Sequence, residues 1–174
     1  MSVSTLVTTV ATANANSYVD LTEFNQYIDD RANASSLSTQ SDDNKTRALL
    51  QATREIDLCK YSGTKYYTGH SDDGDPIQAL AFPRGYMFAN NGTYIPREVK
   101  NAQCEQALQI LKLSTQKQDS DDNDNLASFS RGGVSASFKE KTSKNQDQKR
   151  LAPKALHYLR DHLVGGSGII QLIR

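Results

Sequence analysis

The chain has 174 residues, of which 37% are hydrophobic, so it can bury one modest core and must leave much polar surface. Its 20 basic and 20 acidic residues cancel, which argues against a general nucleic-acid binder and against a polybasic membrane-surface protein. No apolar stretch approaches the length of a transmembrane helix, and residues 1–16 lack the basic and apolar regions of a signal peptide. We therefore expect one domain that is either surrounded by solvated loops or completed by partner subunits.

Residues 1–17 are predicted to form an extended arm, in which the β-branched run Leu6–Val10 has the composition of a strand. A first helix is expected to begin after Asp20, which stands three residues before Glu23, the spacing of a capping box. Apolar residues then fall on one helical face: Leu21, Phe24, Tyr27 and Ile28. The small polar residues at 33–40 are expected to end this helix.

A second helix is predicted over residues 41–61, because Asp42 and Asp43 suit the positive end of a helix dipole. Its apolar stripe contains Leu49, Ala52, Ile56 and Cys59. Gly63 is expected to stop it. The pattern then dissolves over residues 62–95, which hold several tyrosines, glycines and prolines. A loop of this length indicates a binding or assembly role, or an element that the pattern misses.

A third helix is predicted from Pro96 onward, and its wide apolar stripe indicates a central position. It gives way to the acidic stretch 116–125. Apolar and polar residues then alternate on either side of Gly132–Gly133, which is typical of a β-hairpin with a glycine turn. A fourth helix is expected near Pro153, with an apolar face made of Leu151, Ala155, Leu156, Leu159 and Leu163.

The fold class that follows is mainly α. We expect a four-helix bundle with a small β-hairpin, long loops and extended N- and C-terminal segments. The predicted core residues are Leu49, Ile56, Leu108, Ile110, Leu156 and Leu159.

Catalytic and metal-binding patterns are missing from the sequence. Cys59 and Cys104 fit small buried hydrophobes, and the three histidines show no metal-ligand spacing with them. The acidic run from residue 119 begins like a calcium loop, but Asp124 stands where glycine is required and Ser130 where glutamate is required. With no nucleophile elbow, phosphate loop or dinucleotide fingerprint, we expect no cofactor, no metal and no enzymatic activity.

A local basic excess follows the hairpin and consists of Lys139, Lys141, Lys144, Lys149 and Arg150. Three roles remain open for it. It can face a DNA phosphate backbone, pair with the acidic loop Asp119–Asp124 of a neighbouring subunit, or form a plain solvated loop.

The C-terminal segment combines a flexible glycine linker with an aliphatic end. The linker holds Gly165, Gly166 and Gly168, and the end holds Ile169, Ile170, Leu172, Ile173 and Arg174. Exposed to water, such a segment would be a sticky strand. It is expected either to complete the protein's own small sheet or to dock into a partner subunit by strand addition or groove filling.

Several stretches together resemble one family of tailed-phage proteins. In chain order they are Ala15–Val19, Leu49–Thr53, Tyr61–Thr64, Gln78–Arg84, Ile95–Pro96, Gly133–Ser135 and Leu172–Arg174. The order and spacing of these stretches, more than any one motif, resemble the phage head-to-tail adaptor, or head-completion, family. Its sequence domain is often labelled a DnaT-like single-stranded DNA-binding protein. Phe82 departs from the tryptophan that is common in the family, but it keeps an aromatic anchor.

The resemblance implies a structural role in the virion, at the head-to-tail interface, after assembly in the host cytoplasm. It implies a homo-oligomeric ring of about twelve subunits beneath the portal protein. This ring would extend the DNA channel, contact packaged double-stranded DNA transiently, and offer a platform to tail or neck proteins, with no membrane contact. Residues 1–17 would then be an arm, 18–164 an adaptor domain with loops at 62–95 and 116–150, and 165–174 a tail that docks onto the portal.

The apolar-aromatic-Pro-Arg run is expected to pin the long loop against the helices. Phe82 and Pro83 would pack on them, and Arg84 would bind a carboxylate or a helix C-terminus.

The alternative function is that of a single-stranded DNA-binding, DnaT-like replication-accessory protein. It predicts salt-sensitive binding and a concentrated basic and aromatic groove. The neutral net charge counts against it.

Overall fold

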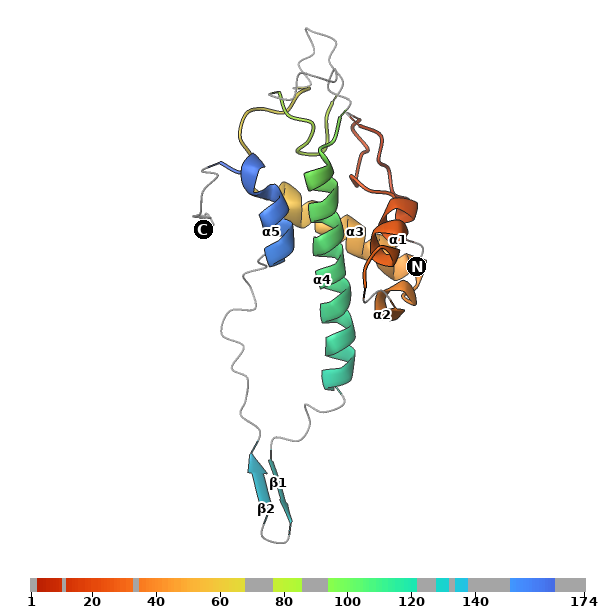
Figure 1. Cartoon of the computed structure of the whole chain (residues 1–174), viewed down its shortest axis with the longest axis vertical. Helices are drawn as coiled ribbons and strands as arrows, with labels where there is room; N and C mark the ends of the chain where they lie inside the picture. Colours follow the sequence, from red (N-terminus) through yellow and green to blue (C-terminus); the bar gives the residue numbers. More distant parts are fainter. Residues whose placement is uncertain are drawn as a thin grey trace.

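The computed structural model of the chain describes residues 3–10, 12–32, 35–67, 77–85, 94–121, 128–131, 134–137 and 151–164. Its elements are α1 (Leu21–Asp29), α2 (Ser35–Ser38), α3 (Asp42–Asp57), α4 (Arg97–Asp121), β1 (Ser128–Arg131), β2 (Val134–Ser137), α5 (Pro153–Leu159) and a final 3-10 turn (Arg160–His162). The predicted mainly helical fold with four principal helices is confirmed (Figure 1). The two strands pair antiparallel, with Ser128 opposite Ser137 and Arg131 opposite Val134, as the predicted hairpin requires.

Helix α4 is the centre of the fold. Its main packing partners are α3 and α5, and Figure 1 shows α3 crossing behind it with α1 and α5 on opposite sides. Most of the predicted wide apolar stripe is buried, namely Val99, Ala102, Cys104, Ala107, Leu108 and Leu111, whereas Leu113, also predicted to belong to it, is exposed. The C-terminal part of α4 continues past the other helices toward the hairpin (Figure 1). Within the described residues, no helix is both long and apolar enough to cross a membrane.

The N-terminal boundaries of α1 and α3 are set by side-chain caps, of which the sequence predicts the one at Asp20. The Asp20 carboxylate accepts from the backbone N–H of Glu23 at 2.8 Å, and the Glu23 carboxylate accepts from the N–H of Asp20 at 3.3 Å. Ser41 caps α3 through the N–H of Asn44. Because the caps satisfy N–H groups that have no partner within the helix, each helix begins where its cap stands.

Three boundaries differ from the prediction. Helix α3 ends at Asp57 and not at Tyr61, because Tyr61 leaves the helix to form an isolated antiparallel bridge with Leu163. Helix α4 runs to Asp121 through a stretch predicted to be loop, since no glycine or proline interrupts residues 97–121. The polar segment after α1 contains the single helical turn α2, which the pattern misses because Leu37 is the one hydrophobic residue in this turn.

Four of the six predicted core residues are fully enclosed. Leu49, Ile56, Leu108 and Leu159 are at most 1% exposed, whereas Ile110 and Leu156 are only partly buried. Cys104 is buried and Cys59 half-buried, both as free thiols, which agrees with their interpretation as small hydrophobes.

The first residues of the chain fold back upon themselves. The Asn16 side chain accepts from the N–H of Val7 at 2.8 Å and donates to the carbonyl of Thr5 at 3.0 Å. The N–H of Asn16 also donates to the carbonyl of Val7. The β-branched run therefore has partners in its own segment, and within the described residues it joins no sheet.

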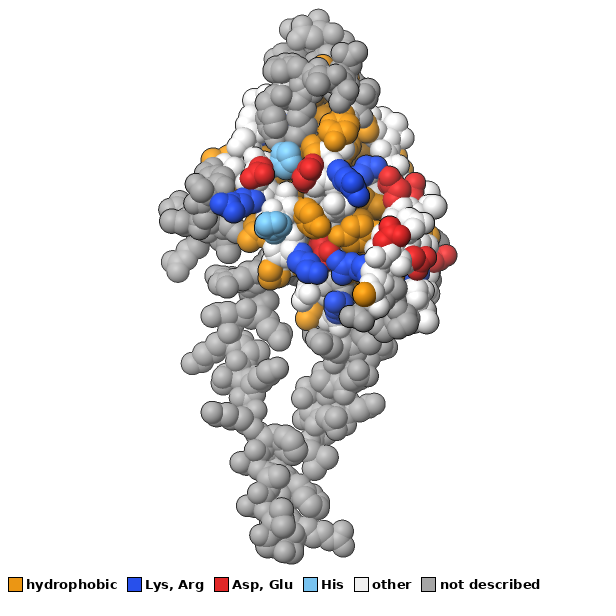
Figure 2. Space-filling view, viewed as in Figure 1, with side chains coloured by type: hydrophobic (Ala, Val, Ile, Leu, Met, Phe, Trp, Pro, Cys, Tyr) orange, Lys and Arg blue, Asp and Glu red, His pale blue; other side chains and the backbone are white. Residues whose placement is uncertain are grey.

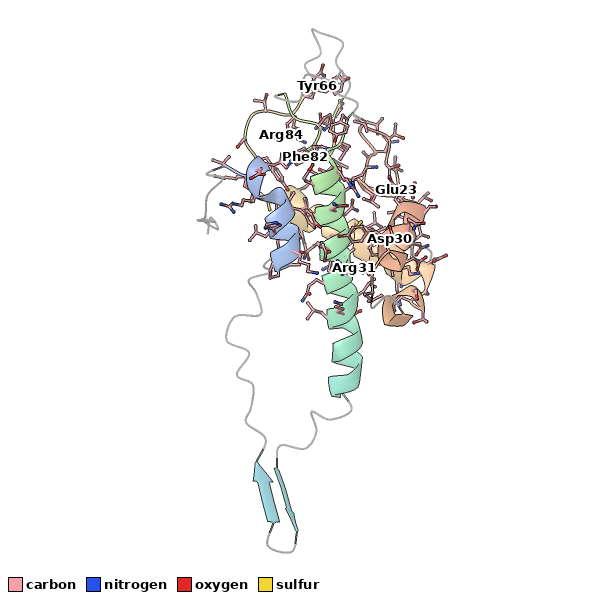
Figure 3. All side chains as sticks on the ribbon, viewed as in Figure 1. Glu23, Asp30, Arg31, Tyr66, Phe82 and Arg84 are labelled. Atoms are coloured by element: carbon pink, nitrogen blue, oxygen red, sulfur yellow. The ribbon has the colours of Figure 1, made fainter. Side chains whose placement is uncertain are left out.

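The loop between α3 and α4 is attached to the core by the Phe82–Pro83–Arg84 run (Figure 3). The Phe82 ring is 1% exposed and meets the rings of Tyr61 and His162 edge-on, with centroids 4.7 and 5.4 Å away. Burial lowers the pKa of His162, so at neutral pH this ring packs uncharged.

Arg84 fills the turn that follows α3. Its guanidinium donates to the carbonyls of Tyr61 and Gly63 and, through Nε, to that of Ser62 at 3.0 Å. It also lies over the Tyr61 ring, 5.8 Å from the centroid. The expected partners were a carboxylate or a helix C-terminus. The observed partners are consecutive backbone carbonyls just beyond the end of α3.

A buried carboxylate completes this attachment. Asp57, the last residue of α3, accepts from the Tyr18 hydroxyl at 2.5 Å and from the N–H of Ala81 at 3.1 Å. The Tyr18 hydroxyl in turn accepts from the N–H of Phe82 at 3.3 Å. Burial raises the pKa of Asp57, and it also raises that of Tyr18. The N-terminal segment, α3 and the long loop are thus joined by one polar network.

The side chain of Gln103 on α4 is fully enclosed and makes four hydrogen bonds. Its amide nitrogen donates to Ser17 Oγ at 2.7 Å, Thr53 Oγ1 at 2.9 Å and the Leu49 carbonyl at 3.2 Å. Its amide oxygen accepts from the N–H of Tyr18 at 2.9 Å. One side chain therefore ties the N-terminal segment and α3 to α4.

Replacing Gln103 by Leu is expected to lower the free energy of unfolding by about 1–3 kcal/mol. The leucine fills the space but leaves the Tyr18 N–H without an acceptor in the core. Urea denaturation followed by circular dichroism measures the change. Gln109, half-buried on the same helix, serves as the control for a Gln→Leu change. A loss no greater than that of Gln109→Leu would contradict the role given to Gln103.

The Arg84→Lys variant is expected to lose about 1–3 kcal/mol of stability, although it keeps the charge. An ammonium cannot donate in a planar fork to three successive carbonyls, so at least one buried carbonyl loses its donor. Arg47→Lys, on the exposed face of α3, is the matched control and should change stability by less than about 0.5 kcal/mol. Equal stabilities of the two variants in thermal melts would refute this account.

Candidate functional site

The residues that the sequence singled out divide into two groups. Phe82, Pro83 and Arg84 are enclosed in the core, where they support the fold and face no open site. The basic residues Lys139, Lys141, Lys144, Lys149 and Arg150 lie outside the described residues, as does the segment Gly165–Arg174 with its predicted docking role. The described part of the chain holds no group of three His, Cys, Asp or Glu side chains placed to bind a metal.

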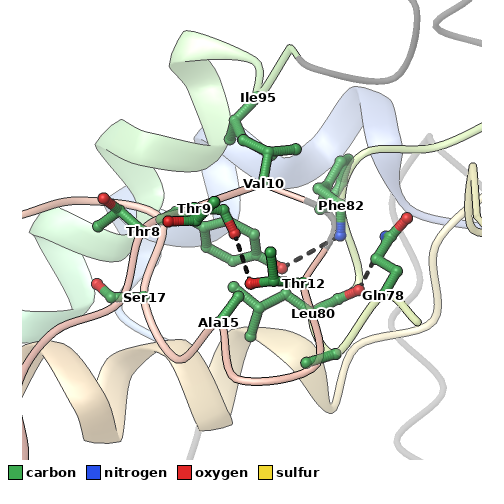
Figure 4. A pocket seen from close by; sticks show the side chains of 12 residues that line it. Thr8, Thr9, Val10, Thr12, Ala15, Ser17, Gln78, Leu80, Phe82 and Ile95 are labelled. Atoms are coloured by element: carbon green, nitrogen blue, oxygen red, sulfur yellow. Dashed lines mark hydrogen bonds between the residues drawn. The ribbon is translucent and has the colours of Figure 1, made fainter. Parts of the chain in front are cut away.

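One cavity lies between the N-terminal segment and the long loop (Figure 4). It is lined by Thr8, Val10, Ala15, Leu80, Phe82 and Ile95, among others, and its volume is about 10 Å³. That volume accommodates one water molecule at most. The cavity is therefore a packing gap at the seam between two segments and not a ligand site.

A larger groove, of about 620 Å³, runs between α1, α4 and α5. Its lining consists of Tyr27, Asp30, Arg31, Arg97, Asn101, Glu105, Pro153, Lys154, His157 and Tyr158. Figure 3 shows Asp30 and Arg31 at the end of α1 that faces α4. Figure 2 shows basic, acidic and hydrophobic side chains mixed across this face of the molecule. We call this the α1–α4–α5 groove.

Helical spacing explains why these side chains meet. Arg97, Asn101 and Glu105 are four residues apart on α4, so they form one row along three successive turns. Lys154 and Tyr158 repeat the same spacing on α5. The α1 side comes from the last turn of that helix and the residues just after it. Each wall is thus a single helical face, held in place by the packing of α5 on α4.

Glu105 lies deepest in the groove, with only 6% of its surface exposed. Its Oε1 accepts from the Tyr27 hydroxyl at 2.7 Å and from the Arg31 guanidinium. The guanidinium also lies over the Tyr27 ring, 5.3 Å from the centroid. Burial raises the pKa of Tyr27 to about 12, with a further contribution from the hydroxyl of Tyr158, so Tyr27 remains a proton donor to the carboxylate.

The outer part of the groove carries cations and rings. Arg97 and Lys154 are exposed, and neither side chain makes an ion pair or hydrogen bond with another described residue. The His157 and Tyr158 rings on α5 lie edge to face, and their centroids are 6.2 Å apart. The exposed charges of the groove are thus these two cations and the carboxylate of Asp30, which accepts from Gln26, whereas the Glu105 carboxylate is enclosed at the base. Such a groove can hold an anionic chain at its rim and planar groups further in.

Sequence patterns alone do not predict this groove, because Arg97, Asn101 and Glu105 stand in a segment that they identify only as the third helix. The one available signal was the four-residue spacing of polar residues within a helix that was predicted to be central. This spacing does not predict which other helices pack beside these three residues.

Comparison with known proteins adds one finding. The sequence matches the family described as "Putative DnaT-like ssDNA binding protein" over residues 5–174, nearly the whole chain. No curated protein and no solved structure matches it. The expected resemblance is thus confirmed for the DnaT-like label, and the chain belongs to the Putative DnaT-like ssDNA binding protein family.

Proposed function

We propose that the protein binds single-stranded DNA, with the α1–α4–α5 groove as its contact surface. The observation that carries the proposal is the pair of exposed cations, Arg97 and Lys154, which form no ion pair with a described residue and lie beside the tyrosine rings of the same groove. The family to which the chain belongs supports it, since its description names binding of single-stranded DNA. The function proposed is binding and not catalysis.

The chemistry of the groove suits a single strand better than a duplex. Aromatic rings stack only on bases that have left the double helix, and Tyr158 and His157 stand within the groove and not on a convex surface. Cations at the rim then meet the backbone phosphates. The neutral net charge is a sum over the whole chain, so it argues against DNA binding only where the charges are spread evenly. A short contact needs few cations, provided that they are gathered in one place.

Removing both rim cations, in the double variant Arg97→Ala/Lys154→Ala, is expected to weaken binding and make it less sensitive to salt. Each phosphate contact with a single strand contributes about 0.7 to the slope of log K against log salt, so the slope should fall by about 1.4. Fluorescence anisotropy of a labelled oligonucleotide, titrated at several salt concentrations, gives the slope.

The matched control is Arg47→Ala/Arg54→Ala, which removes the same charge from exposed positions of α3, a helix that contributes nothing to the groove. It should leave the slope almost unchanged. Equal effects of the two double variants would mean that binding depends on diffuse charge, and the groove would lose its assignment.

A second candidate function is the phage head-to-tail adaptor, for which we propose a ring beneath the portal with tail or neck proteins below. Two observations favour it. The first is the order and spacing of the motifs from Ala15–Val19 to Leu172–Arg174. The second is that α4 continues beyond the other helices toward the β1–β2 hairpin, an extended shape suited to contacts between subunits (Figure 1).

Under the adaptor function, images of the phage particle should contain this chain between portal and tail. Deletion of Ile169–Arg174 should then abolish attachment to the portal, because the aliphatic end would supply the docking contact. Portal pull-down and infectivity measure the effect. The docking role is lost if both survive the deletion unchanged, and tight DNA binding by a small nuclease-treated oligomer would favour the first candidate.

A further inference from the structure

The base of the α1–α4–α5 groove presents a hydrogen-bond acceptor to which no described residue donates. Both donors that reach Glu105, the Tyr27 hydroxyl and the Arg31 guanidinium, bind the same oxygen, Oε1. No described residue donates to Oε2. In the described part of the protein, no fully buried polar side-chain atom lacks a partner, so Oε2 must retain access to the groove.

The orientation of this acceptor is set by its neighbours. Arg31 and Tyr27 hold Oε1 from the α1 side, which leaves Oε2 as the atom available to a ligand. The side chain is only 7% exposed, so little water covers it. A carboxylate oxygen in such a place gains most from a ligand that brings an N–H donor.

Resting on the proposed binding of single-stranded DNA, we infer that Glu105 selects bases with an exocyclic amino group. The buried carboxylate repels phosphates, whereas the exposed Arg97 and Lys154 attract them, so the backbone lies along the rim and a base points inward. Cytosine then offers its N4 amino group to Oε2.

Thymine and uracil are disfavoured at the same position. They carry a carbonyl oxygen where cytosine has its amino group, and two oxygens without a proton between them repel. Their one N–H is flanked by carbonyl oxygens on both sides, which face the carboxylate as well. The groove therefore discriminates by the atom at position 4 of a pyrimidine, independently of how well the ring stacks.

The test compares oligodeoxycytidine with oligodeoxyuridine, each about eight nucleotides long, on the full chain at pH 7.5. The two ligands have the same backbone and ring size and no 5-methyl group. Wild-type protein is expected to bind the cytidine oligomer about tenfold more tightly. A cytidine oligomer dimethylated at N4, which retains the ring but has no donor there, should bind as weakly as the uridine oligomer.

The variant Glu105→Gln supplies the converse result. Its amide oxygen should stay beside Arg31 and Tyr27, because both are donors, so the amide N–H₂ takes the place of Oε2. The preference should then disappear or reverse toward uridine, whose position-4 oxygen accepts from that amide. Glu98→Gln, an exposed position of α4 that does not line the groove, is the matched control and should keep the cytidine preference.

The outcomes separate the two claims. Equal affinity of wild-type protein for the three oligomers, or tighter binding of uridine, overturns the role of Glu105 but leaves DNA binding in place. Failure of every oligomer to bind overturns both. Because the dimethylated ligand needs no protein variant, the inference can be rejected even if Glu105→Gln does not fold.

Discussion

The Gln103 amide is the interaction on which the arrangement of the helices depends. A buried amide must satisfy two N–H donors and an oxygen away from water, and it does so here only where the N-terminal segment, α3 and α4 meet. Apolar packing alone would allow these elements to slide past one another, since leucine and alanine faces fit in several registers. The hydrogen bonds that Gln103 donates to Ser17 and Thr53 and accepts from Tyr18 select one of them. With that register fixed, α1 is brought beside α4, and the α1 side of the groove follows.

The long loop shows that the need to satisfy buried polar groups also decides where the functional surface lies. Its aromatic residues are candidates for stacking on bases when the sequence is considered alone. In the structure, Tyr61 and Phe82 are at most 6% exposed, Asp57 accepts from the N–H of Ala81, and Arg84 donates to the carbonyl of Tyr61. These rings therefore pack in the core and cannot contact a ligand. Tyr94, at the end of the loop, is 46% exposed, and Tyr27 on α1 and Tyr158 on α5 are half-buried in the groove.

The charges of this protein explain its proposed binding properties only when the burial of each charged side chain is taken into account. The chain as a whole is neutral, and the groove itself contains both signs. What matters is that Arg97 and Lys154 are exposed, whereas Glu105 is almost entirely enclosed and neutralised on one oxygen by Arg31. A polyanion meets the rim cations first, and a buried carboxylate acts over a short distance on whatever enters. Exposed cations can thus attract any nucleic-acid backbone, while the enclosed carboxylate can select among the bases that enter the groove.

Local sequence patterns determined much of this protein without reference to tertiary structure. The cap at Asp20, the stripes of α3 and α4, the hairpin and the family resemblance depend on neighbours within a few turns or on the order of motifs, and both can be read directly. Tertiary structure decided the end of α3, where Tyr61 pairs with Leu163, and the burial of Arg84 against successive carbonyls. It also decided the groove, because Tyr27, Glu105 and Tyr158 belong to three helices whose proximity depends on contacts between residues far apart in the chain. A helix face shows its periodicity in the sequence, but its neighbours are chosen by packing and by the need to satisfy buried polar groups.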